Sequence, residues 1–141
     1  MAGDCVLQVE RNGELEASYL DPDDSTDAVA ATALVDPFGL VFDSSTGSPV
    51  NGARVELVDA VTGSPAQVFG DDGVSVYPSV MVTGQQVTDA GGTVYSFPPG
   101  VFRFPLIVPG SYRLVIEPPA DYVHPSAVPD ATLQDLPGAP F

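Results

Sequence analysis

Lysine and tryptophan are absent from the sequence, and histidine and cysteine each occur once. The four basic residues are all arginines and face 19 acidic residues, which gives a formal net charge of -15 at pH 7. Nucleic-acid binding requires clustered cations, so no nucleic-acid partner is expected. An anionic membrane surface would repel the chain, and no apolar run approaches the ~20 residues that span a bilayer. No direct membrane insertion is therefore expected.

The single histidine and the single cysteine limit the chemistry that the chain can perform. One His124 and one Cys5 cannot complete a typical zinc site, and a lone cysteine forms no intrachain disulfide. Ser126, His124 and Asp121 could be drawn as a catalytic triad, but neighbours on one loop do not supply that geometry, and no nucleophile elbow is present. Cys5 is taken as a free thiol. We predict no catalytic residue and no enzymatic activity.

Glycine and proline are abundant instead, at 14 and 15 residues in a chain that is 44% hydrophobic. They separate short apolar runs, as in "VFDSSTGSPVNGARVEL" (41–57), and no window shows a helical period. This pattern predicts an all-β fold, a β-sandwich of about seven or more strands. Strands are expected at 38–42, 53–58, 67–69, 93–97, 101–107 and 111–117, with turns at 43–52 and 89–92 and short edge strands around Pro78.

The N-terminal part has its own pattern, and we place a boundary at Asp36-Pro37. Asn12-Gly13 lies between two alternating runs and predicts a hairpin within 5–20, followed by a strand at 28–35. Residues 1–35 are therefore expected to be either the end of a preceding module or an extra strand pair. Residues 36–126 form the predicted sandwich domain, and residues 127–141 a proline-rich linker. The proline-rich sequence from Pro118 onward is expected to act as a strap that leads into this linker.

Three motifs in the central region resemble the carboxypeptidase-regulatory-like and collagen-adhesin B-type repeat superfamily. They are "GLVFDSSTGSPVNGARVEL" (39–57), "VTDAGGTVYSF" (87–97) and "VPGSYRLVIEPPADYVHPS" (108–126), in the family's order. The resemblance covers roughly residues 36–126. It implies an Ig-like or transthyretin-like (prealbumin-like) β-sandwich, used as a repeat module in bacterial surface proteins. Two features depart from the family: no lysine is available for an internal isopeptide bond, and the 59–87 segment is long.

The function that this resemblance implies is a non-catalytic structural or spacer module of a large bacterial cell-surface or secreted adhesin-like protein, which calcium could stiffen. Its partners would be neighbouring modules of the same chain, and its location extracellular. No signal peptide is recognised, so the secretion signal is expected elsewhere in a longer parent protein. Two alternatives stay open: a module that binds a surface glycan or protein, and an accessory domain fused to a secreted hydrolase.

Calcium is the one cofactor that the sequence suggests. Four acidic residues crowd the loop "DPDDSTD", and flexible acidic loops suit calcium, although this is not the EF-hand pattern. The alternative is a solvated turn whose carboxylates accept backbone N–H groups. The residues concerned are Asp21, Asp23, Asp24 and Asp27.

The remaining candidate positions are expected to be structural. Asp43, Asp71-Asp72-Gly73 and Asp89-Ala90-Gly91-Gly92 are turn sequences, and a shared ion is possible only if the fold brings such loops together. An aromatic cluster could bind sugar, but tryptophan is absent and the alternating pattern assigns about half of the rings to a core. The cluster consists of Tyr95, Phe97, Phe102, Phe104 and Tyr112.

Overall fold

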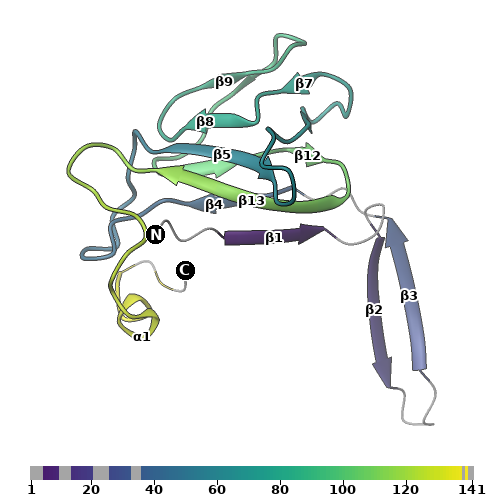
Figure 1. Ribbon diagram of the computed structural model, residues 1–141, viewed down its shortest axis with the longest axis horizontal. Helices are drawn as coiled ribbons and strands as arrows, with labels where there is room; N and C mark the ends of the chain where they lie inside the picture. The colour runs from purple at the N-terminus through teal and green to yellow at the C-terminus, as the bar shows by residue number, and fades with distance from the viewer. Residues whose placement is uncertain (1–4, 10–13, 21–25, 33–35, 138, 140–141) are drawn as a thin grey trace.

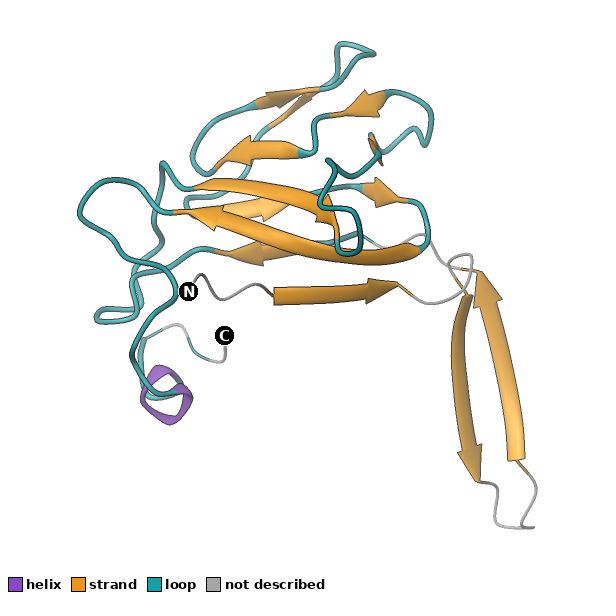
Figure 2. Ribbon diagram, in the orientation of Figure 1, coloured by secondary structure: helices purple, strands orange, loops and turns teal. Residues whose placement is uncertain are grey.

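Antiparallel β-strands are the dominant elements of the computed structural model, which describes residues 5–9, 14–20, 26–32, 36–137 and 139 (Figure 2). The all-β prediction is confirmed at this level. In chain order the elements are β1 (Cys5–Val9), β2 (Glu14–Leu20), β3 (Thr26–Thr32), β4 (Phe38–Leu40), β5 (Arg54–Asp59), β6 (Val68–Phe69), β7 (Val76–Tyr77), β8 (Val80–Val82), β9 (Val87–Thr88), β10 (Val94–Tyr95), β11 (Val101–Arg103), β12 (Leu106–Ile107), β13 (Gly110–Glu117) and α1 (Asp130–Leu133).

The largest sheet has the order β1-β13-β5-β8, and β13 is bonded to strands on both sides. A second sheet has the order β12-β6-β7, and three ribbons pair β11 with β4, β10 with β9 and β2 with β3. Strands β7 and β8 flank Pro78, and each lies at the edge of its sheet. The prediction that this proline excludes a central strand is confirmed, because proline cannot donate to the ladder.

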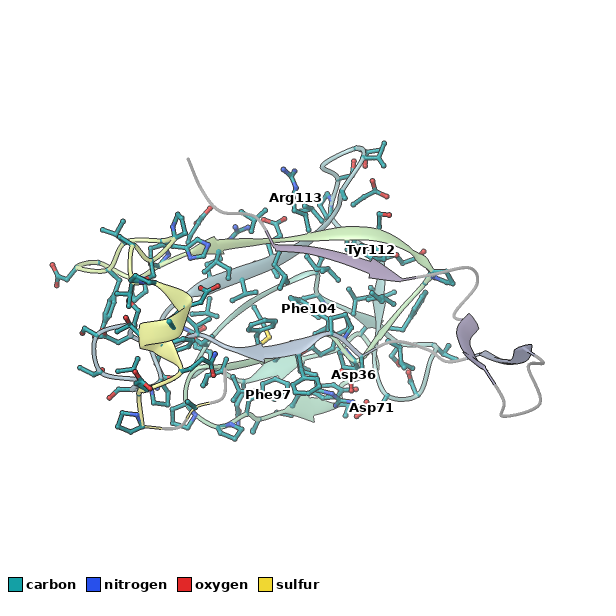
Figure 3. All side chains as sticks on the ribbon, turned by 90° about the horizontal axis from the view of Figure 1, so that it is seen from below. Asp36, Asp71, Phe97, Phe104, Tyr112 and Arg113 are labelled. Atoms are coloured by element: carbon teal, nitrogen blue, oxygen red, sulfur yellow. The ribbon has the colours of Figure 1, made fainter. Side chains whose placement is uncertain are left out.

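The apolar core lies between the large sheet and the strands that face it. Figure 3 shows Phe104 between the β1–β13 ribbons and the ribbon of β4. Phe104 has no exposed surface, and Tyr77 packs edge-on against it with ring centroids 6.4 Å apart. The buried apolar cluster comprises Val55, Leu57, Val68, Tyr77, Met81, Val87, Tyr95, Phe102, Phe104, Ile107 and Tyr112. Core packing of the aromatic cluster, with Phe97 partly buried against it, is confirmed.

The predicted strand at 101–107 is wrong as a single element. Phe104 and Pro105 interrupt it, so β11 pairs with β4 while β12 pairs with β6. Pro105 has no N–H to continue a ladder, and the Phe104 N–H donates instead to the Pro37 carbonyl over 2.8 Å. The break lets one segment contribute strands to two sheets, with Phe104 buried at the crossing point.

The hairpin predicted around Asn12-Gly13 is also wrong for the described strands. Strand β1 pairs with β13, with Cys5 opposite Leu114, and β2 pairs with β3 over seven residue pairs. The Asn-Gly signal reports only a local turn preference, whereas the eight-residue strand β13 has a second edge, opposite β5, with which β1 pairs. The β2–β3 ribbon extends away from the other sheets (Figure 1).

The C-terminal residues return to the body of the protein. After β13 the chain contains α1, which the sequence pattern did not predict, and Leu136 and Pro137 then reach the turn at Gly47. A Cβ atom added to Gly47 would lie 2.6 Å from the Pro137 carbonyl oxygen. Gly47 also has a φ of 79°, which favours glycine. Residues 118–137 therefore lie as a strap over the 43–47 turn.

Candidate functional site

Three aspartates in turns, Asp43, Asp59 and Asp72, accept hydrogen bonds from backbone N–H groups of their own turns. Asp43 Oδ1 accepts the Ser45 N–H over 2.8 Å, and Asp59 Oδ1 accepts the N–H groups of Val61 and Thr62, both over 2.8 Å. The hydrogen bond from the Ser45 side chain is the main reason that the pKa of Asp43 lies below its usual value. The backbone N–H of Thr62 does the same for the pKa of Asp59. These carboxylates stabilise turns, as predicted for Asp43.

Asp72 closes the turn of the Asp71-Asp72-Gly73 sequence in the same way. Its Oδ1 accepts the N–H groups of Val74 and Ser75 over 2.9 and 2.8 Å, and its Oδ2 accepts the Ser75 hydroxyl over 2.5 Å. The Ser75 hydroxyl is the largest cause of the lowered pKa of Asp72. The turn interpretation of this sequence is confirmed for Asp72.

The Asp71 and Asp89 loops, far apart in sequence, meet at the Tyr95 hydroxyl. Asp89 is only 5% exposed; its Oδ1 accepts the N–H groups of Gly91 and Thr93, both over 2.9 Å. Tyr95 donates to Asp89 Oδ2 over 3.0 Å and accepts the Asp71 N–H over 3.0 Å. The turn predicted at 89–92 is confirmed, and the fold does bring the two acidic loops together.

The guanidinium group of Arg103 lies beside the Asp71 loop at the point where it meets the Asp89 loop. Arg103 Nε–H donates to Asp36 Oδ2 over 2.9 Å. The Nη1 and Nη2 groups of Arg103 donate to Asp71 Oδ2 and Oδ1 over 3.2 and 2.7 Å. Figure 3 shows Asp36 and Asp71 close to each other. The hydrogen bond with Asp71 is the largest cause of the raised pKa of Arg103. Arg103 thus joins β11 to two loops, and the sequence offered no local signal for this contact.

Two segments that follow different strands enclose a cavity of about 310 Å³. One wall is the turn after β4, and the other is the first part of the strap, which follows β13. Ser126 Oγ donates to Ser44 Oγ over 2.7 Å and holds the two walls together. The cavity is lined by Val41, Phe42, Asp43, Ser44, Ser45, Val50, Ile116, Pro118, Pro119, Asp121, Tyr122, Val123, His124 and Ser126.

This cavity brings together the three residues from which a triad could be drawn, Asp121, His124 and Ser126. The hydroxyl of Ser126 is engaged with Ser44 and accepts the Val128 N–H over 3.0 Å. Sequence reasoning identified the strap, but it did not predict that the strap and the 43–47 turn enclose a cavity.

The proposed calcium loop falls mainly outside the described residues. Asp21, Asp23 and Asp24 lie outside them, and Asp27 is in β3, opposite Tyr19. Across the described parts of the chain, no group of three or more histidine, cysteine, aspartate or glutamate side chains is placed to hold a metal ion.

Comparisons with protein-family models, with curated proteins and with solved structures find no match. Among the described residues, no helix is long and apolar enough to cross a membrane. The fold and the local chemistry are therefore the basis on which a function can be proposed.

Proposed function

We propose that this chain is a non-catalytic structural module of a large bacterial cell-surface or secreted protein, with an Ig-like or transthyretin-like β-sandwich over residues 36–126. The sequence resemblance to carboxypeptidase-regulatory-like and collagen-adhesin B-type repeats suggests the family. The antiparallel sheets around a closed aromatic core are compatible with such a sandwich. The module would act through its shape and stiffness.

The observation that carries this proposal is the use made of polar side chains. Asp43, Asp59 and Asp72 hold turns, and Arg103 ties two loops to β11. In this protein these charged groups stabilise loop conformations, whereas in an enzyme such groups orient a substrate. Loops fixed in this way favour a domain that keeps its dimensions, which is what a spacer requires.

The chain direction through the large sheet defines what such a module would separate. Cys5 at the start of β1 lies opposite Leu114, and Val9 lies opposite Gly110, so β1 enters the sheet at the end where β13 leaves it. The chain therefore enters and leaves the large sheet on one side of the molecule (Figure 1). Neighbouring modules would be spaced by the width of this domain, in a branched or zigzag arrangement.

Replacing the module in its complete parent protein tests this proposal. Residues 5–126, which include β1 because it pairs with β13, would be exchanged for an unrelated β-sandwich whose ends also lie on one side. A structural role predicts that surface display and the activity of the parent are retained. A shortened exchange that joins the flanking segments directly should impair both. Loss of activity with the full-sized replacement would show a specific role and overturn the proposal.

A glycan- or protein-binding module is the second candidate, and the cavity of about 310 Å³ favours it. Its volume lies at the lower end of the range of small-ligand sites. The same replacement separates the two candidates, because an unrelated sandwich keeps the spacing and loses the cavity.

A further inference from the structure

The cavity under the strap has a chemical character that the structural role does not use. Its polar lining includes the carboxylates of Asp43 and Asp121, the hydroxyls of Ser44 and Ser126, and His124. Among the described residues that line the cavity there is neither lysine nor arginine. Two acidic residues in a lining without lysine or arginine favour a negative potential in this concave site, which concentrates cations and repels anions.

Asp43 is suited to accept a further hydrogen bond from a ligand. Its Oδ1 is held by the N–H and the hydroxyl of Ser45, which fixes the carboxylate on the turn. A carboxylate offers about four acceptor positions, so Asp43 keeps capacity for a hydrogen bond from a ligand. Asp121 is exposed on the opposite wall, at the start of the strap. A ligand between the two segments could therefore contact a carboxylate from each wall.

The remaining lining is apolar and aromatic, including Val41, Ile116, Pro119 and Tyr122. Tyr122 is 43% exposed, so part of its ring is accessible to a ligand. An aliphatic stem can cover such surface while its charged end reaches a carboxylate, and aromatic faces attract cations. A bare metal ion would use none of this apolar surface, and calcium takes six to eight oxygen ligands.

We propose that the cavity between the 41–45 turn and the 118–126 strap binds an aliphatic primary ammonium group, with Asp43 and Asp121 as its charge partners. The ligand class comprises the lysine side chain of a partner protein and small free amines. The chain contains no lysine, so no lysine side chain of its own can occupy the site. The inference goes beyond the structural role. Failure of the module replacement would overturn the structural role alone, and failure of the ligand titration would overturn amine binding alone.

Titration of the whole chain followed by NMR or calorimetry tests the inference. The probes are Nα-acetyl-lysine methylamide and 1,5-diaminopentane, with the Nε-acetylated lysine derivative and the norleucine derivative as uncharged controls. We expect saturable binding of at least one amine, shifts centred on the cavity residues, and no binding of the uncharged controls. Stronger binding of the lysine derivative indicates a protein partner, and stronger binding of the diamine a free amine.

Matched variants separate the site from the general negative charge. Asp43→Asn and Asp121→Asn should each weaken amine binding about tenfold or more, since each removes one charge-assisted hydrogen bond. Asp59→Asn also removes one charge from a turn, but it lies outside the cavity and should leave binding unchanged. Equal weakening in all three variants, no binding of either amine, or binding of neutral sugars alone would overturn the proposal. Thermal melting verifies that each variant is folded.

Discussion

Tyr95 donates its hydroxyl proton to Asp89 Oδ2 over 3.0 Å and, through the same oxygen, accepts the N–H of Asp71 over 3.0 Å. Asp89 is buried in the turn between β9 and β10, and Asp71 belongs to the loop after β6. The close packing includes Gly70, where an added Cβ atom would lie 2.6 Å from both Asp89 Oδ2 and the Tyr95 hydroxyl. One phenol oxygen therefore fixes two loops that belong to different sheets.

Tyr95→Phe should destabilise the protein by about 2 kcal/mol, because it removes a donor from a buried carboxylate and an acceptor from a backbone N–H. The free energy of unfolding from urea titration measures this loss. Tyr122→Phe is the control, since Tyr122 is exposed and should change the free energy by no more than about 0.5 kcal/mol. Similar effects of the two variants would contradict the structural role assigned to the Tyr95 hydroxyl.

Tyr77 should make stability fall at alkaline pH. Burial raises the pKa of Tyr77 above its usual value of 10, and its hydroxyl donates to the Arg103 carbonyl over 3.0 Å. A raised folded-state pKa means that its contribution is complete below pH 10 and is lost as the pH rises above 10. Tyr77→Phe should therefore cost about 1 kcal/mol at pH 7, and the difference from wild type should shrink above pH 10.

Urea unfolding of both proteins at pH 7 and at pH 11 measures this change in difference. Tyr122→Phe is again the control for the removal of a phenol hydroxyl, since Tyr122 is 43% exposed. A Tyr77→Phe difference that stays constant from pH 7 to pH 11 would show that the phenol does not titrate differently in the folded and unfolded states.

The parts of the fold that were predictable from sequence depend on neighbours along the chain. Asp43 and Asp89 accept N–H groups two to four residues away, so their turns are encoded by local sequence. Alternation along 111–117 placed Tyr112 in the core, where it is 4% exposed. Period-two patterns report one buried face directly, whatever the strand pairs with.

The contacts that were not predictable join segments far apart in the chain. Arg103 meets Asp36 and Asp71 across separations of 67 and 32 residues. The cavity likewise forms only because the strap returns to the 43–47 turn. Strand β1 pairs with β13, which lies about a hundred residues further along the chain. Local preference carries no information about which distant segment arrives, so turn residues such as Asn12-Gly13 favoured a nearby pairing.

The pairing of β1 with β13 predicts a specific cross-link. Cys5 is opposite Leu114, and the Cα atoms of directly opposed residues lie about 4.5–5.5 Å apart, within the range for a disulfide. Leu114→Cys should therefore form an intrachain disulfide with Cys5 on mild oxidation, detected by non-reducing electrophoresis and mass spectrometry. Val115→Cys is the control, because neighbouring residues of a strand point to opposite faces. Equal cross-linking of both variants, or of neither, would contradict the register.

Calcium binding by Asp21, Asp23, Asp24 and Asp27 predicts a rise in melting temperature when calcium is added. An ion that binds only the folded state stabilises by about 2.7 kcal/mol at 100 times its Kd, which corresponds to roughly 5–10 °C for a domain of this size. The net charge of -15 complicates the measurement, because any divalent cation screens repulsion in the folded chain.

Magnesium at equal concentration is therefore the necessary reference, with EGTA as the ion-free state. Specific binding requires that the wild-type chain gains more from calcium than from magnesium, and that Asp23→Asn/Asp24→Asn loses only this excess. Magnesium prefers a tighter octahedral shell than a flexible acidic loop provides, so general screening and specific coordination give different results. Equal gains from both ions, unchanged in the variant, would contradict calcium binding and favour the solvated turn as the interpretation of this acidic stretch.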